Sequence, residues 1–177
     1  DLIKAELLLR EQIVQVVDFL RKYIPGYGDC RLKDSADVLG VRETRRILGE
    51  YVLTDEDVLT GARFPDVVVH NARFSVDIHN PTGGGQAEGK AKKTRPYDIP
   101  LRCLIPRKID GLIVTGRCIS GTHRAHASYR VMKIAIPLGQ AAGIAAALSA
   151  QKDVLPRELP ADAVQKVLLD SGVILFD

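Results

Sequence analysis

The chain has 177 residues, of which 46% are hydrophobic and 27% charged; this supports one globular domain with a buried core and excludes a disordered or fibrous protein. The formal net charge is +3, the basic residues are dispersed and the aromatic content is 5%, so we expect no nucleic-acid partner. The three cysteines are widely spaced, which predicts neither a disulfide framework nor a zinc site and favours a cytoplasmic protein with reduced thiols. We find no apolar run long enough to span a bilayer and expect no membrane partner.

The first predicted element is an amphipathic helix that begins at the first residue and ends near Tyr23. Its apolar residues recur at helical spacing on one face, and Pro25, Gly26 and Gly28 predict the turn that ends it. Because the chain starts abruptly inside this helix, we expect it to be a fragment of a larger protein.

Extended structure and a short helix are predicted next. Residues 38–44 and 46–54 have the composition of strands, and Thr54 is expected to cap a short helix over 55–60. Residues 66–70 are ambiguous, because Pro65 favours a helix start whereas three consecutive valines favour a strand. We predict a helix there.

The middle of the chain is predicted to alternate between extended segments and loops. Residues 73–79 and 97–104 are expected to be extended, and 111–115 to form a short apolar strand. The glycine- and lysine-rich stretch 82–95 is expected to be an exposed, mobile loop. It lacks the Gly-Lys-Ser or Gly-Lys-Thr run of a phosphate-binding loop.

Two helices are predicted in the last third of the chain. Residues 134–149 are rich in alanine and leucine. Pro137 must lie in or near the first turn, because an interior proline costs about 3 kcal/mol; we therefore expect a start near Ile136, with a kinked earlier start as the alternative. A final amphipathic helix is expected over 160–171, ended by Gly172.

The segment between Gly116 and the alanine-rich helix is expected to be a polar loop with binding chemistry. Unpaired amides at a helix start carry partial positive charge, and the loop offers arginine, serine, threonine and histidine side chains that can bind phosphate, ribose or flavin oxygens. This pattern favours a nucleotide-like cofactor. The alternative is that Gly139 and Gly143 only permit close packing of the helix on a sheet.

Five segments, in order, resemble the C-terminal half of the FAD-dependent oxidoreductase family, in the two-dinucleotide-binding-domain flavoprotein group. They are VRETRRILGEYVLT, DIHNP, YDIPLRCLIP, GLIVTGRCISGTHRAHASYRVM and LGQAAGIAAAL. The resemblance implies an α/β or α+β fold, namely a partial FAD/NAD(P)-binding-type domain with a mixed sheet and flanking helices that lacks the N-terminal GxGxxG unit. It also implies one C-terminal fragment made of 1–110 (a helix and part of a substrate or cap sheet), 111–150 (a returning FAD-domain strand, loop and helix) and 151–177 (a helix and tail).

The resemblance implies FAD as cofactor, with the helix start facing the pyrimidine edge of the flavin ring. The implied cofactor-binding residues are Gly116, Arg117, Ser120, Arg130, Leu138, Gly139, Gln140 and Ala141. The chain departs from the family where Lys133 replaces the usual proline and Pro137 replaces an alanine-like residue. Without the GxGxxG unit, we expect the isolated chain to bind FAD weakly or not at all.

The candidate catalytic residues are three histidines and an arginine. His123 and His126 are close in sequence, and hydrogen bonding near a flavin is favoured over metal binding because no ligand pattern surrounds them. His79 shares a strand face with Asp77. Arg45 is our first choice for carboxylate recognition, although a solvated charge run is the alternative.

The function that follows is that of an enzyme. The whole protein is expected to take a hydride from a small organic substrate, with this chain completing the flavin site. Expected partners are the missing N-terminal half, the substrate and a second copy through an exposed sheet. The alternative is a noncatalytic protein-interaction or scaffold domain.

Overall fold

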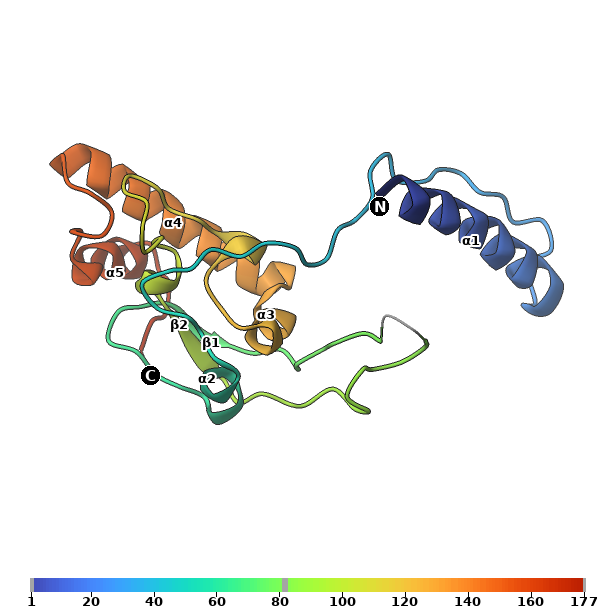
Figure 1. The fold of residues 1–177 in the computed structure, drawn as a ribbon, viewed down its shortest axis with the longest axis horizontal. Helices are drawn as coiled ribbons and strands as arrows, with labels where there is room; N and C mark the ends of the chain where they lie inside the picture. The colour runs from blue at the N-terminus through green and yellow to red at the C-terminus, as the bar shows by residue number, and fades with distance from the viewer. Residues whose placement is uncertain (1, 81–82, 177) are drawn as a thin grey trace. The chain divides into compact units, whose positions relative to one another are not determined.

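The computed structural model describes residues 2–80 and 83–176. The chain divides into two compact units, Asp1–Arg42 and Glu43–Asp177. Within the described residues, the first unit contains helix α1, and the second contains the other helices and the sheet (Figure 1).

The first unit consists of α1 (Leu2–Tyr23) and an irregular segment after it. The helix ends at the predicted residue, and Gly26 turns the chain with a φ of 87°. Arg21 donates hydrogen bonds of 3.0 and 2.8 Å to the Cys30 carbonyl, which ties the segment back to the helix. None of the described residues of α1 is buried, so its apolar side chains face a shallow groove or solvent.

The second unit contains a small sheet surrounded by helices. Its helices and strands are α2 (Asp55–Thr60), β1 (Val67–Ala72), β2 (Tyr97–Pro100), α3 (His123–Tyr129), α4 (Met132–Lys152) and α5 (Ala161–Asp170), with 3₁₀ turns at Leu101–Cys103 and Gly116–Cys118. β1 and β2 are antiparallel, with Val67 opposite Pro100 and Ala72 opposite Tyr97. A single parallel bridge joins Leu53 to Gly121. The expected fold class, a partial α/β domain of the FAD-binding type, is confirmed.

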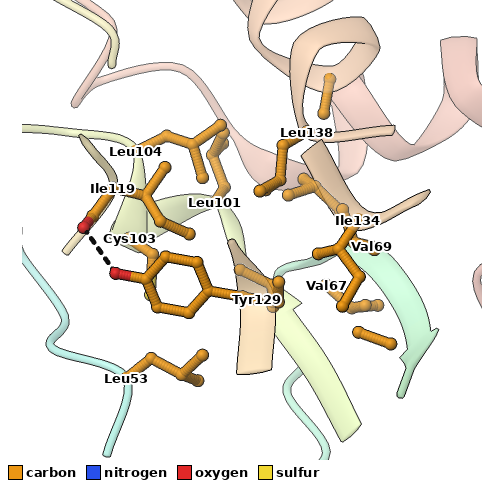
Figure 2. Close-up of a cluster of buried hydrophobic side chains, with 14 of the residues drawn as sticks. Leu53, Val67, Val69, Leu101, Cys103, Leu104, Ile119, Tyr129, Ile134 and Leu138 are labelled. Atoms are coloured by element: carbon orange, nitrogen blue, oxygen red, sulfur yellow. Dashed lines mark hydrogen bonds between the residues drawn. The ribbon is translucent and has the colours of Figure 1, made fainter. Parts of the chain in front are cut away.

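The core of this unit forms where α4 packs against β1 and α5. Figure 2 shows Ile134 and Leu138 of α4 facing Val67 and Val69 of β1. On the other side of the cluster, the Tyr129 hydroxyl donates a 3.0 Å hydrogen bond to the Ile119 carbonyl (Figure 2). This bond satisfies the polar end of a fully buried ring and fixes the segment that leads into α3.

Two short-range predictions are confirmed by the capping geometry. Thr54 and Asp57 form a capping box at α2, with hydrogen bonds of 3.2 and 2.8 Å between each side chain and the other's amide. Gly61 ends α2 with a φ of 80°. At the other end of the unit, Gly172 follows α5 with a φ of 82°, as expected for its stop.

The helix predicted over 66–70 is wrong. These residues enter β1, where Val67, Val68 and Val69 are all buried. The preference of three β-branched side chains for a pleated, packed surface outweighs the helix-start signal of Pro65.

The strands predicted over 38–44 and 46–54 are also wrong. In the described structure they form no ladder, and only isolated bridges join Gly49 to Pro106 and Leu53 to Gly121. Two backbone hydrogen bonds flank the first bridge, from the Glu50 amide to the Ile105 carbonyl and from the Arg107 amide to the Leu48 carbonyl, both at 2.9 Å, and the pairing does not extend into a ladder. The unit boundary at Arg42 interrupts the earlier segment.

The remaining extended segments are shorter than predicted. Residues 73–79 contribute only the bridges of Val76 and His79, and the 97–104 segment turns into a 3₁₀ helix after Pro100. The strand predicted over 111–115 does not form in the described structure: Gly111 is a bend with a φ of 69°, and the residues after it have no ladder partner. Of the loop predicted over 82–95, residues 83–93 are mostly exposed and irregular, but Thr94 is buried and its hydroxyl donates to the Phe74 carbonyl at 3.1 Å. Residue 82 lies outside the described residues, and mobility stays a prediction.

The expected polar loop before the alanine-rich helix is largely helical. α3 occupies His123–Tyr129, and α4 starts at Met132, four residues before the expected start at Ile136. Pro137 therefore lies in the second turn, where it has no amide to donate to the Lys133 carbonyl. The earlier start that we kept as an alternative is the one observed.

The expectation that no apolar run could span a bilayer is wrong by length and composition. α4 has 21 residues, and its most apolar window is long enough to cross a membrane. A core helix passes the same test, and α4 buries Ile134, Leu138 and Ala141 against the rest of the unit.

Candidate active site

The start of α3 is fixed by short-range and long-range hydrogen bonds. Thr122 is the N-cap: its hydroxyl accepts from the Ala125 amide at 3.2 Å and donates to Asp55 at 2.9 Å. The Thr122 amide also donates to the Leu53 carbonyl at 2.9 Å. The backbone of His123, the first residue of α3, is therefore held in place.

A carboxylate joins the two predicted histidines. Glu43 Oε1 lies 2.8 Å from His123 Nδ1, and Glu43 Oε2 lies 3.5 Å from His126 Nδ1. Arg46 contacts the same carboxylate through Nη1 and donates from Nε to the Gly121 carbonyl at 3.0 Å. Two imidazoles, a guanidinium and a carboxylate thus meet at the start of α3.

The two histidines differ in their surroundings. His126 is 1% exposed, packs edge-on against Tyr129 and has no hydrogen-bond partner for either ring nitrogen among the described residues. Burial lowers the pKa of His126 to about 4, although the Glu43 carboxylate opposes the shift. The His123 side chain is 56% exposed, so of the two it is the one that a substrate can reach.

The electrostatic state of Glu43 follows from the same contacts. Burial raises the pKa of Glu43, but the hydrogen bonds from His123 and Arg46 and the charge interactions with His126 and His123 together hold the pKa below its usual value. At neutral pH the site therefore contains a carboxylate anion beside a solvent-accessible imidazole. A pair of this kind can take up and release a proton.

His79 lies in a second polar cluster. His79 Nε2 is 3.1 Å from Asp77 Oδ2, and Gln86 donates to the other oxygen of Asp77 at 2.6 Å. Arg130 donates to the Asp77 carbonyl and to its carboxylate at 2.8 and 3.0 Å. Burial raises the pKa of Asp77, but the contacts with Gln86, His79 and Arg130 together hold it below the usual value. Arg130 is thus engaged by Asp77.

The predicted arginine is not the one in the cluster. Arg45 is exposed, whereas Arg46 reaches Glu43. Glu43 and Arg46 lie in an irregular segment, where a spacing of three residues does not indicate that two side chains share a face, so the sequence contains no signal for this pair. No sequence signal connects Glu43 to His123, because 80 residues separate them.

The structure separates the expected cofactor-binding residues into different environments. Since α4 starts at Met132, the amides of Gly139, Gln140 and Ala141 lie in the helix interior. The Leu138 and Ala141 side chains face the core, whereas Gly139 and Gln140 are exposed. Cofactor binding by these residues stays a prediction.

The other expected cofactor-binding residues lie before α3. Gly116 has a φ of 73°, a conformation that favours glycine, and Arg117 beside it is exposed. Ser120 is buried, and its hydroxyl has no hydrogen-bond partner within the described parts of the chain.

The first turn of α4 combines exposed apolar side chains with amides that have no acceptor in the part of the chain that the structure describes. Val131 provides no side-chain cap, and within the described structure the amides of Met132 and Lys133 have no acceptor. Met132 and Ile136 are 80% and 72% exposed beside them. A flat apolar ring with a negatively polarised edge fits such a surface, because the helix start carries partial positive charge. The 177 residues contain no GxGxxG turn for the pyrophosphate.

Comparison with known proteins identifies the class. A family model described as FAD dependent oxidoreductase matches residues 1–168. The chain therefore belongs to the FAD-dependent oxidoreductase family. No curated protein and no solved structure matches it.

Proposed function

We propose that this chain forms the part of an FAD-dependent oxidoreductase that meets the flavin ring, and that the whole protein transfers a hydride from a small organic substrate to FAD. The observation that carries the proposal is the uncapped start of α4 with its exposed apolar side chains, Met132 and Ile136. In this arrangement the amides of Met132 and Lys133, rather than those after Pro137, face the pyrimidine edge of the ring.

The chemistry divides between the cofactor and this chain. FAD, when bound, supplies the acceptor for the hydride of a substrate C–H bond. The chain supplies an acceptor for the proton that must leave the hydroxyl or amine on the same carbon. His123 is exposed and hydrogen-bonded to Glu43 at 2.8 Å, so it is suited to take that proton as the carbonyl or imine forms.

Two exposed features support the docking of further FAD-domain structure. Residues 111–115 have no regular secondary structure, and in the described structure only the Val114 amide among them makes a backbone hydrogen bond, to the Leu104 carbonyl at 2.8 Å. α4 exposes small residues at helical spacing, including Gly139 and Gly143. A strand and a closely packed neighbour can cover these surfaces. The N-terminal half of the protein is the proposed occupant, with self-association as the alternative.

Other partners and the location of the protein remain proposals. A small-molecule substrate fits the exposed His123, and nothing in the charge distribution favours nucleic acid. The three cysteines are free, which supports a reducing compartment such as the cytoplasm.

A noncatalytic role is favoured by one observation. α1 exposes apolar side chains along its length, among them Leu2 at 65%, Ile3 at 74% and Val14 at 59%. A helix of this kind is typical of a surface that binds another protein. This role and an enzymatic role for the second unit are compatible.

The test is flavin binding by the full-length gene product that contains this chain. We expect the purified protein to show bound-flavin absorbance and quenched flavin fluorescence, and the 177-residue chain alone to show weak binding or none. A full-length protein that takes up no FAD on titration would overturn the proposal.

A further inference from the structure

Glu43 is the residue through which the charged groups of the candidate site are connected. It contacts Arg46, lies 2.8 Å from His123 Nδ1 and lies 3.5 Å from His126 Nδ1. Its side chain is 26% exposed. No sequence pattern pointed to it.

The geometry restricts the orientation of the His123 ring. The backbone of His123 is held by the Thr122 cap, which Asp55 supports at 2.9 Å. The ring presents Nδ1 to the Glu43 carboxylate, and Nε2 has no recorded partner among the described residues. A carboxylate accepts hydrogen bonds, so the proton of a neutral His123 lies on Nδ1 and the lone pair on Nε2.

The carboxylate itself is held in place. Arg46 binds it and is anchored in turn by a 3.0 Å hydrogen bond to the Gly121 carbonyl. The other charged groups around α3 are directed elsewhere: Arg124 pairs with Glu88 at 2.9 Å and lies 3.8 Å from Asp55. His126 is neutral at physiological pH, because burial lowers its pKa to about 4. Glu43 is therefore the anion that faces His123.

We infer that Glu43 is a positioning residue that fixes His123 as the Nδ1-protonated tautomer and so makes Nε2 the proton acceptor in substrate oxidation. The role in the reaction rests on the proposed function. As the substrate C–H bond gives up its hydride to FAD, the O–H or N–H bond on that carbon breaks, its proton moves to His123 Nε2, and its electron pair forms the new double bond. A positioned base of this kind contributes on the order of 10²–10⁴ in rate.

The first experiment measures the tautomer and requires no flavin. Long-range ¹H–¹⁵N NMR of the 177-residue chain at about pH 8.5, well above the reference pKa of imidazole, reports which His123 nitrogen carries the proton. We expect Nδ1–H in the wild type and a mixture of tautomers in Glu43→Gln. The matched control is Glu88→Gln, which removes a carboxylate paired with the next residue of α3 and should leave His123 unchanged.

The second experiment measures substrate oxidation by the full-length gene product. Glu43→Gln should lower kcat by about tenfold or more, less than the loss of the base itself, with KM changed by less than about twofold. Glu43→Asp, which keeps the charge, should recover part of kcat. A residue needed only for folding would not separate kcat from KM in this way.

The outcomes are distinguishable. A wild-type His123 protonated on Nε2, or a tautomer that Glu43→Gln leaves unchanged, overturns the inference, and so does an unchanged kcat in that variant. If Glu43→Gln fails to fold, the tautomer of His123 in the wild type and the kcat of the Glu43→Asp variant still test the inference. A full-length protein without flavin would defeat the proposed function, whereas the NMR result would stand by itself.

Discussion

His126 shows how a single buried residue can limit stability. Both of its ring nitrogens lack hydrogen-bond partners among the described residues, and an unsatisfied buried polar group costs about 1–3 kcal/mol. A core position selected for packing alone would carry an apolar ring. The retention of an imidazole beside Glu43 and His123 is therefore more easily explained by the site than by the fold.

The pH dependence of unfolding should reveal this residue. Because burial lowers the pKa of folded His126 to about 4 from 6.5, the unfolded chain binds more protons between these values. The free energy of unfolding therefore has its full value above pH 6.5 and decreases as the pH drops toward 4, by up to about 3 kcal/mol. We expect urea unfolding to show that the free energy of unfolding decreases less in His126→Phe than in the wild type between pH 6.5 and 4, the range called the acid limb below.

The same comparison has a second expectation and a control. At pH 7, His126→Phe should retain its free energy of unfolding within about 1 kcal/mol, because it removes two unpartnered nitrogens. Lys108→Gln, at an exposed residue whose charge does not change between pH 4 and 6.5, should leave the acid limb as in the wild type. A His126→Phe variant with an unaltered acid limb would contradict this account.

At the scale of elements, the sequence predicted what short-range signals determine. The end of α1 at Tyr23, the N-cap at Thr54 and the stop at Gly172 depend on neighbours within a few residues. β1 was missed because Pro65 and the three valines after it give opposing signals, and the packing that decides between them is tertiary.

The candidate site was predictable only in part for the same reason. The two histidines of α3 were selected from the residues and from the family resemblance. Glu43 and Arg46 were not, because they reach α3 from a segment about 80 residues earlier in the chain. The start of α4 was placed too late, because Pro137 was assumed to begin a helix that in fact tolerates it in the second turn.

Pro137 offers a test of this helix. Pro137→Ala restores an amide that can donate to the Lys133 carbonyl, which stabilises the folded helix. Alanine also gives the unfolded chain more conformational freedom, which lowers the free energy of unfolding, but by less than the restored hydrogen bond and the relieved ring clash raise it. We expect the free energy of unfolding to rise by about 1–2 kcal/mol, measured in urea at pH 7. A loss of stability would instead show that contacts of the proline ring matter more than the missing hydrogen bond.

At the scale of the whole molecule, the chain consists of two units joined at Arg42 and Glu43. Arg42 and Arg45 are exposed beside this boundary, and exposed segments between compact units are preferred sites of proteolysis. The second unit contains the hydrophobic core and every residue of the candidate site, so it should fold without the first.

Limited trypsin digestion tests this division. We expect early cuts at Arg42 or Arg45 and at the lysines of the exposed 83–93 segment, identified by mass spectrometry, and products that keep the helical circular dichroism and the cooperative melting of the second unit. Early cleavage inside α4, or a product with no cooperative transition, would contradict the division.

The most direct test of the central claim, that the start of α4 meets the flavin, is FAD affinity in the full-length gene product with Met132→Glu. A carboxylate at a helix start stabilises the helix by about 0.3–1 kcal/mol, so folding is retained while the negative edge of the ring is repelled. We predict FAD binding weakened by about tenfold or more, with the matched control Leu169→Glu, at an exposed apolar position of α5, unchanged. Equal FAD affinity in Met132→Glu and the wild type would contradict the account.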